Sequence, residues 1–202
     1  FRNGEADILI GTQMIVKGHD FPNVTLVAAL AADMSLYAGD YRSSERTFEL
    51  LMQASGRAGR AEKAGEVVIQ TYNPEEYSIQ AVAGQDAEYF YENELAFRRL
   101  MKYPPYSQMA AILILSEEEN EAKTLSEKLA ENIHSVCGDA VTLIGPSKAG
   151  LSRAKDRYRY VLYVKSMDEE AMACVREIAE EANRRVVNQK TCSVQYDRDP
   201  VN

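Results

Sequence analysis

The stretch "MAAILILSEEE", residues 109–119, joins an apolar run to the start of a helix. Met109 to Leu115 is apolar throughout, which predicts a buried strand. Ser116 and Glu119 follow with the S-x-x-E spacing of a capping box, in which two side chains bond to backbone N–H groups at a helix start. A strand that leads directly into a capped helix indicates a unit of mixed α and β structure.

The same pattern returns further along the chain. Tyr158 to Lys165 alternates as a strand, and Ser166 with Glu169 repeats the capping spacing. Apolar stripes predict the two helices, one at Ala122, Leu125, Leu129, Ile133 and Val136, the other at Val175, Ile178, Ala182 and Val186. With short strands predicted over 141–144 and 192–196, the order β-α-β-β-α-β predicts an α+β ferredoxin-like domain.

The first half of the sequence predicts a different arrangement. Strands are predicted over 6–10, 25–30 and 66–71, and a helix over 43–54 that Gly56 and Gly59 end. This order is typical of an α/β fold with a mostly parallel sheet. A helical stretch then runs from Pro74 to Lys102, where "YPPY" ends it. The predicted organisation is an α/β domain over 1–83, a helical linker over 84–106 and the α+β domain over 107–202.

Composition limits the classes of function. The 202 residues hold 31 acidic and 23 basic side chains, a net charge of −8, so any nucleic-acid site must be a local basic patch. Cys137, Cys174 and Cys192 match neither a disulfide framework nor a zinc knuckle. No apolar run approaches the roughly 20 residues of a membrane span, and no signal peptide is evident. We expect an intracellular, soluble piece of a longer chain.

"QASGRAGR", residues 53–60, spaces Gln53, Arg57 and Arg60 at i, i+4 and i+7. A continuing helix would place all three on one face, with small residues between them that leave room for a ligand. Arginine offers a planar, permanently charged fork that matches phosphate oxygens. The alternative is a helix end with ordinary surface arginines, and a short motif leaves both interpretations open.

"GTQMIVKGHDFP", residues 11–22, follows the first predicted strand. Lys17, Gly18 and Asp20 supply a cation, backbone amides and a carboxylate at the carboxyl end of a parallel sheet, where α/β folds bind ligands. An incidental loop is the alternative, but it would not explain so many polar groups.

"SKAGLSRAKDRYRYVLY", residues 147–163, is the third candidate site. It contains one acid, Asp156, and five cations, namely Lys148, Arg153, Lys155, Arg157 and Arg159. Interleaved tyrosines at 158, 160 and 163 favour contact with single-stranded or forked DNA, because cations bind phosphates and aromatic rings stack on bases. The alternative is a basic hairpin whose Tyr158 and Tyr160 face the core.

Several other polar residues have structural interpretations. Asp168, Glu169 and Glu170 fit the first turn of a helix, where the helix dipole favours acids. For Arg42, Glu45 and Arg46 we favour an ion-paired helix start, and the alternative is that they support the cleft of the candidate ligand site. Neither His19 nor His134 has a second ligand at metal-binding spacing.

The segments "DILIGTQMIVKGHDFPNVTLVAAL", "YRSSERTFELLMQASGRAGRA" and "GEVVIQTYNPE" together resemble the second motor lobe of superfamily 2 helicases. The likeness is specifically to the primosomal replication-restart helicases, the PriA family. "YPPY", "RYRYVLYVK" and "YDRDP" resemble that family's carboxyl-terminal domain. The resemblance implies part of a RecA-like parallel-sheet lobe followed by the ferredoxin-like domain. It also implies an ATP-dependent 3′-to-5′ DNA helicase that restarts replication at stalled forks by primosome assembly.

The resemblance also implies roles for single residues. Residues 11–22 correspond to helicase motif V, which implies DNA contacts by Thr12, Gln13 and Lys17 and nucleotide contacts by Gly18 and Asp20. Residues 53–60 correspond to motif VI, which implies that Gln53, Arg57 and Arg60 face ATP between two motor lobes, the arginines as catalytic fingers.

The implied cofactors are ATP with Mg²⁺ and, upstream of this chain, zinc. The implied partners are forked and single-stranded DNA, single-strand-binding protein and primosome proteins, for a monomer in the bacterial cytoplasm associated with the nucleoid. No G-x-x-x-x-G-K-[ST] loop occurs, so we expect these residues alone not to hydrolyse ATP. The alternatives are a lobe of an excision-repair helicase, against which "GTQM" and the β-α-β-β-α-β order argue, and a module that only binds DNA or protein.

Overall fold

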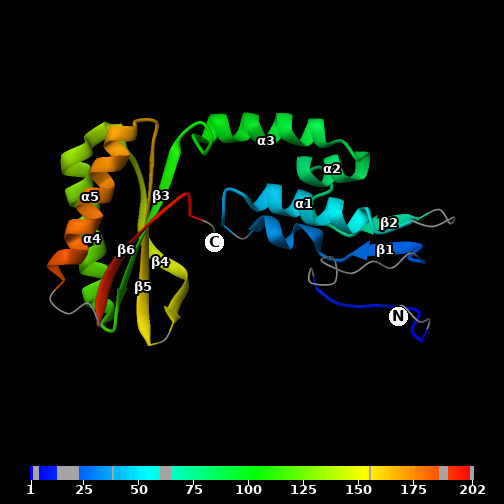
Figure 1. Ribbon diagram of the computed structural model, residues 1–202, viewed down its shortest axis with the longest axis horizontal. Coiled ribbons are helices and arrows are strands. Elements are labelled where there is room, and N and C mark those ends of the chain that lie inside the picture. Colours follow the sequence, from blue (N-terminus) through cyan, green and yellow to red (C-terminus); the bar gives the residue numbers. More distant parts are fainter. Residues whose placement is uncertain are drawn as a thin grey trace. The chain divides into compact units, whose positions relative to one another are not determined.

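The computed structural model describes residues 1, 5–12, 23–37, 39–59, 65–154, 156–186 and 191–200. The chain forms two compact units, Phe1–Phe97 and Arg98–Asn202, each with its own core (Figure 1). The boundary falls inside helix α3 (Ala87–Met101), whereas the sequence predicts a separate helical linker over 84–106. Phe90 of α3 is 1% exposed in the first core, so most of this helix packs as part of the first unit.

The first unit contains a parallel pair of strands, as the sequence predicts. Strands β1 (Leu26–Ala29) and β2 (Glu66–Ile69) pair in parallel with Leu26 opposite Glu66. The helices of this unit are η2 (Ala32–Tyr37), α1 (Ser43–Ser55), α2 (Tyr77–Gly84) and the larger part of α3. A crossover between parallel strands requires a long connection, and α1 lies within it.

The predicted strand over 6–10 is wrong. The described residues 5–12 contain no strand, and Ile8 and Ile10 are 78% and 89% exposed. No strand in the described part of the chain pairs with this segment, because β1 and β2 pair only with each other. A lone extended segment has no neighbour to satisfy its backbone N–H and C=O groups, so apolar composition alone does not make it a strand.

Aromatic stacking holds the helices of the first unit together. The rings of Phe48 on α1 and Phe90 on α3 stack with centroids 4.1 Å apart. Tyr77 on α2 donates its hydroxyl to Glu94 Oε2 at 2.6 Å, and Glu94 is only 3% exposed. Burial, and then the bond to Glu94, raise the pKa of Tyr77 far above its ordinary value. The phenol therefore stays protonated and keeps the buried carboxylate paired.

The second unit has the predicted β-α-β-β-α-β order. Its elements are β3 (Gln108–Ser116), α4 (Glu119–Cys137), η3 (Gly138–Ala140), β4 (Thr142–Ala154), β5 (Arg157–Ser166), α5 (Glu169–Arg185) and β6 (Cys192–Arg198). The strands form one antiparallel sheet in the order β4-β5-β3-β6, the ferredoxin-like arrangement. Strand β4 extends to Ala154 and is much longer than the predicted 141–144.

Helices α4 and α5 lie side by side on one face of this sheet (Figure 1). Ile112, Ile133, Leu162 and Val175 are fully buried between the helices and the strands. The predicted apolar stripe of α4 ends at Ile133, because Val136 is 59% exposed. None of the helices within the described ranges is long and apolar enough to cross a membrane.

Both predicted capping boxes are wrong in position. Ser116 and Ser166 are the last residues of their strands, and the helices begin three residues later, after Glu118 and Asp168. Each serine Oγ accepts the backbone N–H of the residue two positions on, at 3.1 Å in the first case and 2.9 Å in the second. Asp168 caps α5 by accepting from two backbone N–H groups, which confirms the predicted acidic helix start.

Candidate nucleotide and nucleic-acid site

Helix α1 ends before the arginines of "QASGRAGR". Gln53 is exposed in its last turn, and the helix stops at Ser55. The chain then enters a turn over 56–59, in which the Arg57 backbone N–H donates to the Ala54 carbonyl at 3.0 Å. Arg57 therefore lies in the turn after α1 and not on a continuing helix, and Arg60 lies outside the described residues.

The turn at 56–59 is fixed between the starts of the two parallel strands. The Gly59 N–H donates to the Val24 carbonyl at 3.0 Å, two residues before β1. Gly59 has φ of +71°, in the left-handed region that favours glycine. A Cβ on Gly65, the residue before β2, would overlap the Ala58 carbonyl carbon and the Gly59 nitrogen. These backbone contacts hold the partly buried Arg57 beside the sheet.

The start of α1 is ion-paired at Arg46, which confirms that part of the prediction, whereas the Arg42 Nε donates to the Tyr41 hydroxyl at 2.9 Å. Arg46 lies 2.8 Å from Asp40 Oδ2, and the Asp40 side chain is 2% exposed. Asp40 Oδ1 also accepts the Arg42 backbone N–H at 3.0 Å. Arg46 therefore has a structural role at the first turn of the helix, with Asp40 as its partner.

Most of the predicted motif V residues cannot be placed in this site. Thr12 is exposed and follows the segment 5–11, which forms neither a helix nor a strand. Gln13, Lys17, Gly18 and Asp20 lie outside the described residues. Their DNA and nucleotide contacts stay predictions.

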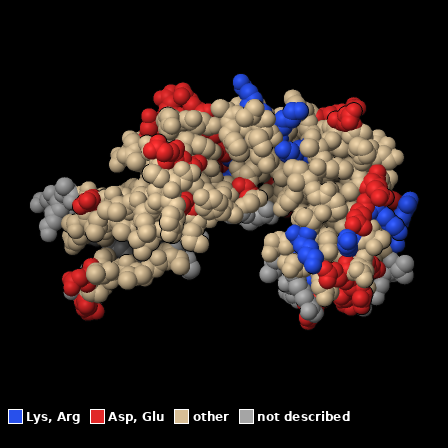
Figure 2. Space-filling model, turned by 180° about the vertical axis from the view of Figure 1, so that it is seen from behind, with Lys and Arg blue, Asp and Glu red and all other residues tan. Residues whose placement is uncertain are grey.

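The basic side chains of the second unit lie in small groups among acidic ones on the face that Figure 2 shows. Lys148 lies opposite Tyr160 in the β4–β5 ladder, on the face that the helices cover, and its Nζ is 2.5 Å from Glu119 Oε1. The bond to Glu119 raises the pKa of Lys148. This lysine is already paired with an acid of α4.

The tyrosines of the basic hairpin face the core. Tyr160 is 7% exposed, and Tyr158 packs against the same cluster. The predicted stacking of these two rings on bases is therefore wrong, because alternation along β5 points both toward α4 and α5. The alternative interpretation, a basic hairpin with core tyrosines, is confirmed for this pair.

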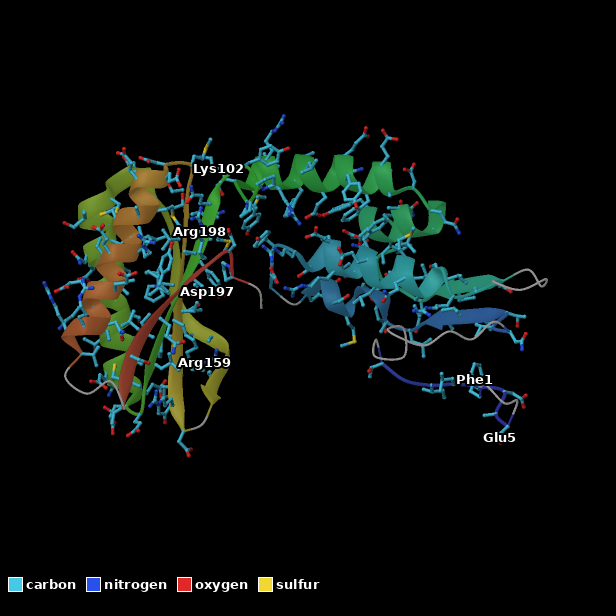
Figure 3. The ribbon with its side chains drawn as sticks, in the orientation of Figure 1. Phe1, Glu5, Lys102, Arg159, Asp197 and Arg198 are labelled. Atoms are coloured by element: carbon cyan, nitrogen blue, oxygen red, sulfur yellow. The ribbon has the colours of Figure 1, made fainter. Side chains whose placement is uncertain are left out.

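Two arginines of the hairpin lie on the other face of the sheet. Arg157 and Arg159 alternate with the tyrosines, and Arg159 lies opposite Leu115 of β3 (Figure 3). Both side chains are partly exposed. Arg153 lies in β4 opposite Tyr158, but its side chain is outside the described part of the structure, as is the whole of Lys155.

Two families match this chain in succession. The helicase conserved C-terminal domain matches residues 1–62, and the primosomal protein N C-terminal domain matches residues 99–201. The chain belongs to the PriA family. The first match contains the turn at 56–59, and the second contains the complete ferredoxin-like sheet.

PriA relatives confirm the assignment along the whole chain. Replication restart protein PriA of Bacillus subtilis is 46% identical over 200 residues, which are 99% of this chain and 25% of the relative. The PriA proteins of Synechocystis and Rickettsia typhi are 42% and 40% identical over 82% and 80% of this chain, which correspond to 20% and 24% of those proteins. The chain therefore spans about a quarter of the length of the PriA proteins that it matches.

A designed protein with a ferredoxin fold is also similar, at 16% identity over 47% of this chain and 86% of the design, with a TM-score of 0.32. The fold assignment of the second unit depends on its strand order.

Sequence reasoning missed two residues that shape these sites. Gly65 is one, although an isolated glycine at the edge of an apolar strand is a signal for close backbone approach. Lys165 is the other. The alternation of residues along β5 places its side chain on the helix-free face, but nothing in the sequence indicates that Lys165 is only 9% exposed.

We predict that Gly65→Ala destabilises the first unit. The new Cβ would collide with the Ala58 and Gly59 backbone, which cannot move without losing the bond to Val24. Overpacking of this kind typically costs about 1–3 kcal/mol, and urea unfolding followed by circular dichroism measures the loss.

Gly150→Ala is the matched control, because a Cβ at Gly150 would meet nothing within 4 Å. We expect its unfolding midpoint to stay close to that of the original chain. Equal stability of the two variants would contradict the close packing at Gly65.

Proposed function

We propose that this chain forms the C-terminal part of an ATP-dependent 3′-to-5′ DNA helicase. The whole protein would recognise stalled replication forks and restart replication by primosome assembly. Membership of the PriA family supports this proposal, and the arginine turn at the end of α1 is the observation that carries its chemistry. The enzyme would be cytoplasmic, in association with the nucleoid.

Motif VI would act on the phosphates of ATP. Negative charge develops on the γ-phosphate during phosphoryl transfer, and an arginine can stabilise it. Arg57 fits this role, because backbone contacts on both sides hold the turn that carries it. Arg60 and Gln53 would contact the same nucleotide, and Gly18 and Asp20 would approach it from motif V.

Mg²⁺ and most phosphate contacts would come from outside this chain. The sequence contains no G-x-x-x-x-G-K-[ST] loop, so another lobe must hold the β- and γ-phosphates. Zinc sites would belong to other parts of the longer protein. Within the described ranges, no group of three or more His, Cys, Asp and Glu side chains could hold a metal ion.

DNA would contact the chain at two places. Thr12, Gln13 and Lys17 of motif V would bind the backbone of the translocated strand. Arg157 and Arg159 would bind phosphates of forked DNA from the helix-free face of the sheet. Single-strand-binding protein and primosome proteins would be the protein partners.

Substitution of Arg57 or Arg60 by Ala in the full-length protein tests the nucleotide role. Removing an arginine finger lowers phosphoryl-transfer rates by about a thousandfold or more. We therefore expect DNA-stimulated ATPase activity to fall by that order, while the thermal midpoint of the protein stays unchanged.

Arg176→Ala removes an exposed arginine of α5 that pairs only weakly with Glu180, at 3.8 Å, and serves as the control. Activity of both finger variants at the level of this control would refute the proposal.

The DNA role is tested by binding of a labelled fork to the 202-residue chain. We expect Arg157→Glu with Arg159→Glu to weaken binding by roughly tenfold and to lower the salt dependence by about two charges. Lys148→Ala should change binding less than about twofold, because Glu119 already pairs with this lysine.

If the arginine double variant and the Lys148 variant lost the same amount of DNA affinity, total charge and not the helix-free face would govern binding. Binding of forked and duplex DNA with one affinity would favour the alternative of a general DNA-binding module.

A further inference from the structure

A cavity of about 300 Å³ lies within the second unit. It forms where the residues after α3 meet the end of β5 and the start of α5, and its lining includes Lys102, Lys165, Thr142, Asp139 and Asp168. Lys165 is near the carboxyl end of β5, which begins at Arg157, and Figure 3 shows Lys102 near the end of the sheet away from Arg159. The cavity is therefore separate from the basic hairpin.

Lys165 is a buried cation at this cavity. Its residue is 9% exposed, its Nζ donates to the Met101 carbonyl at 2.9 Å, and the ammonium lies 4.2 Å from the centroid of the Tyr103 ring. Neither Lys165 nor Lys102 takes part in an ion pair in the described part of the chain. Burying an ammonium without a carboxylate is costly.

The two lysines also repel each other. Burial lowers the pKa of Lys165, and the nearby charge of Lys102 lowers it further. A lysine whose charged form is disfavoured, at a cavity and beside a second lysine, is a candidate for binding an anion.

The two acids at the cavity do not neutralise these lysines. Asp168 uses Oδ1 to accept from the backbone N–H groups of Glu170 and Ala171. Asp139 is exposed on η3, beyond 4.0 Å from either ammonium. Thr142 lies directly opposite Lys165 in the sheet and adds a hydroxyl donor to the lining.

We propose that this cavity binds a phosphate group between Lys102 and Lys165. Lysine ammonium groups act as point charges toward phosphate and need no planar fork. A bound phosphate would oppose the repulsion between the lysines and supply the missing counter-charge of Lys165. Free phosphate and the nucleic-acid backbone both carry this group, and the cavity exceeds the size of a single phosphate.

Titration of the 202-residue chain with ¹³C-labelled lysine, followed by NMR, tests the proposal. We expect inorganic phosphate to raise the pKa of Lys165 relative to chloride at equal ionic strength, since an opposite charge favours the charged form. Lys165→Arg identifies the resonance. Identical titrations in the two salts would overturn the proposal.

Lys102→Ala tests the second cation without disturbing a buried residue, because Lys102 is exposed. We expect this variant to reduce the phosphate-induced rise in the Lys165 pKa by at least about threefold, because one of the two charges that attract the phosphate is lost. Lys123→Ala, at an exposed lysine of α4, removes the same charge elsewhere and should leave the effect unchanged. Equal effects of the two variants would contradict a local site.

A single-stranded oligonucleotide without terminal phosphates identifies the source of the group. If it reproduces the shift at Lys165, the backbone supplies the phosphate; if only inorganic phosphate does, the ligand is a small anion, and either result supports the cavity as a phosphate site. The readout at Lys165 does not depend on ATPase activity or on Arg157 and Arg159, so it can fail while the proposed helicase function stands.

Discussion

The close approach of Gly65 to the Ala58 and Gly59 backbone is the contact on which the first unit depends. It places the end of α1 against the start of β2, while the bond from Gly59 to Val24 holds it against the start of β1. A side chain at Gly65 would separate these segments, at a cost of about 1–3 kcal/mol. That is a large share of the roughly 5–15 kcal/mol that stabilises a typical domain. The position of Arg57 is thus set by backbone packing.

Periodicity in the sequence predicted most of the elements, because burial imposes the pattern. Ile112 and Ile114 alternate toward the helices and are fully buried, and β3 forms where the apolar run lies. The run at 6–10 has similar composition but forms no strand, since a strand also needs a neighbour that the run itself cannot specify. The sequence also did not predict the full length of β4. This strand continues beyond Pro146 because the pairing register shifts between Ile144 and Ser147.

The candidate sites were predictable in residue type but less so in geometry. Five cations in 147–163 indicate a basic hairpin, but only the sheet register shows that Lys148 faces α4 while Arg157 and Arg159 lie on the opposite face. For motif VI, the glycines of "GRAG" predicted the helix end correctly, and the helix end removes the shared face that a longer helix would give Gln53 and Arg57. Burial of Lys165 depends on segments far apart in sequence, namely Met101 and Tyr103.

The central claim is that the turn after α1 presents its arginines to ATP. The most direct measurement is the distance from the Arg57 and Arg60 guanidinium nitrogens to the γ-phosphate mimic, in a structure of the full-length protein with Mg²⁺, ADP and aluminium fluoride. We predict that at least one arginine lies within about 2.7–3.2 Å of the mimic. Both guanidinium groups beyond about 6 Å, with the motor lobes closed on the nucleotide, would contradict the claim, because an arginine finger must contact the charge that it stabilises.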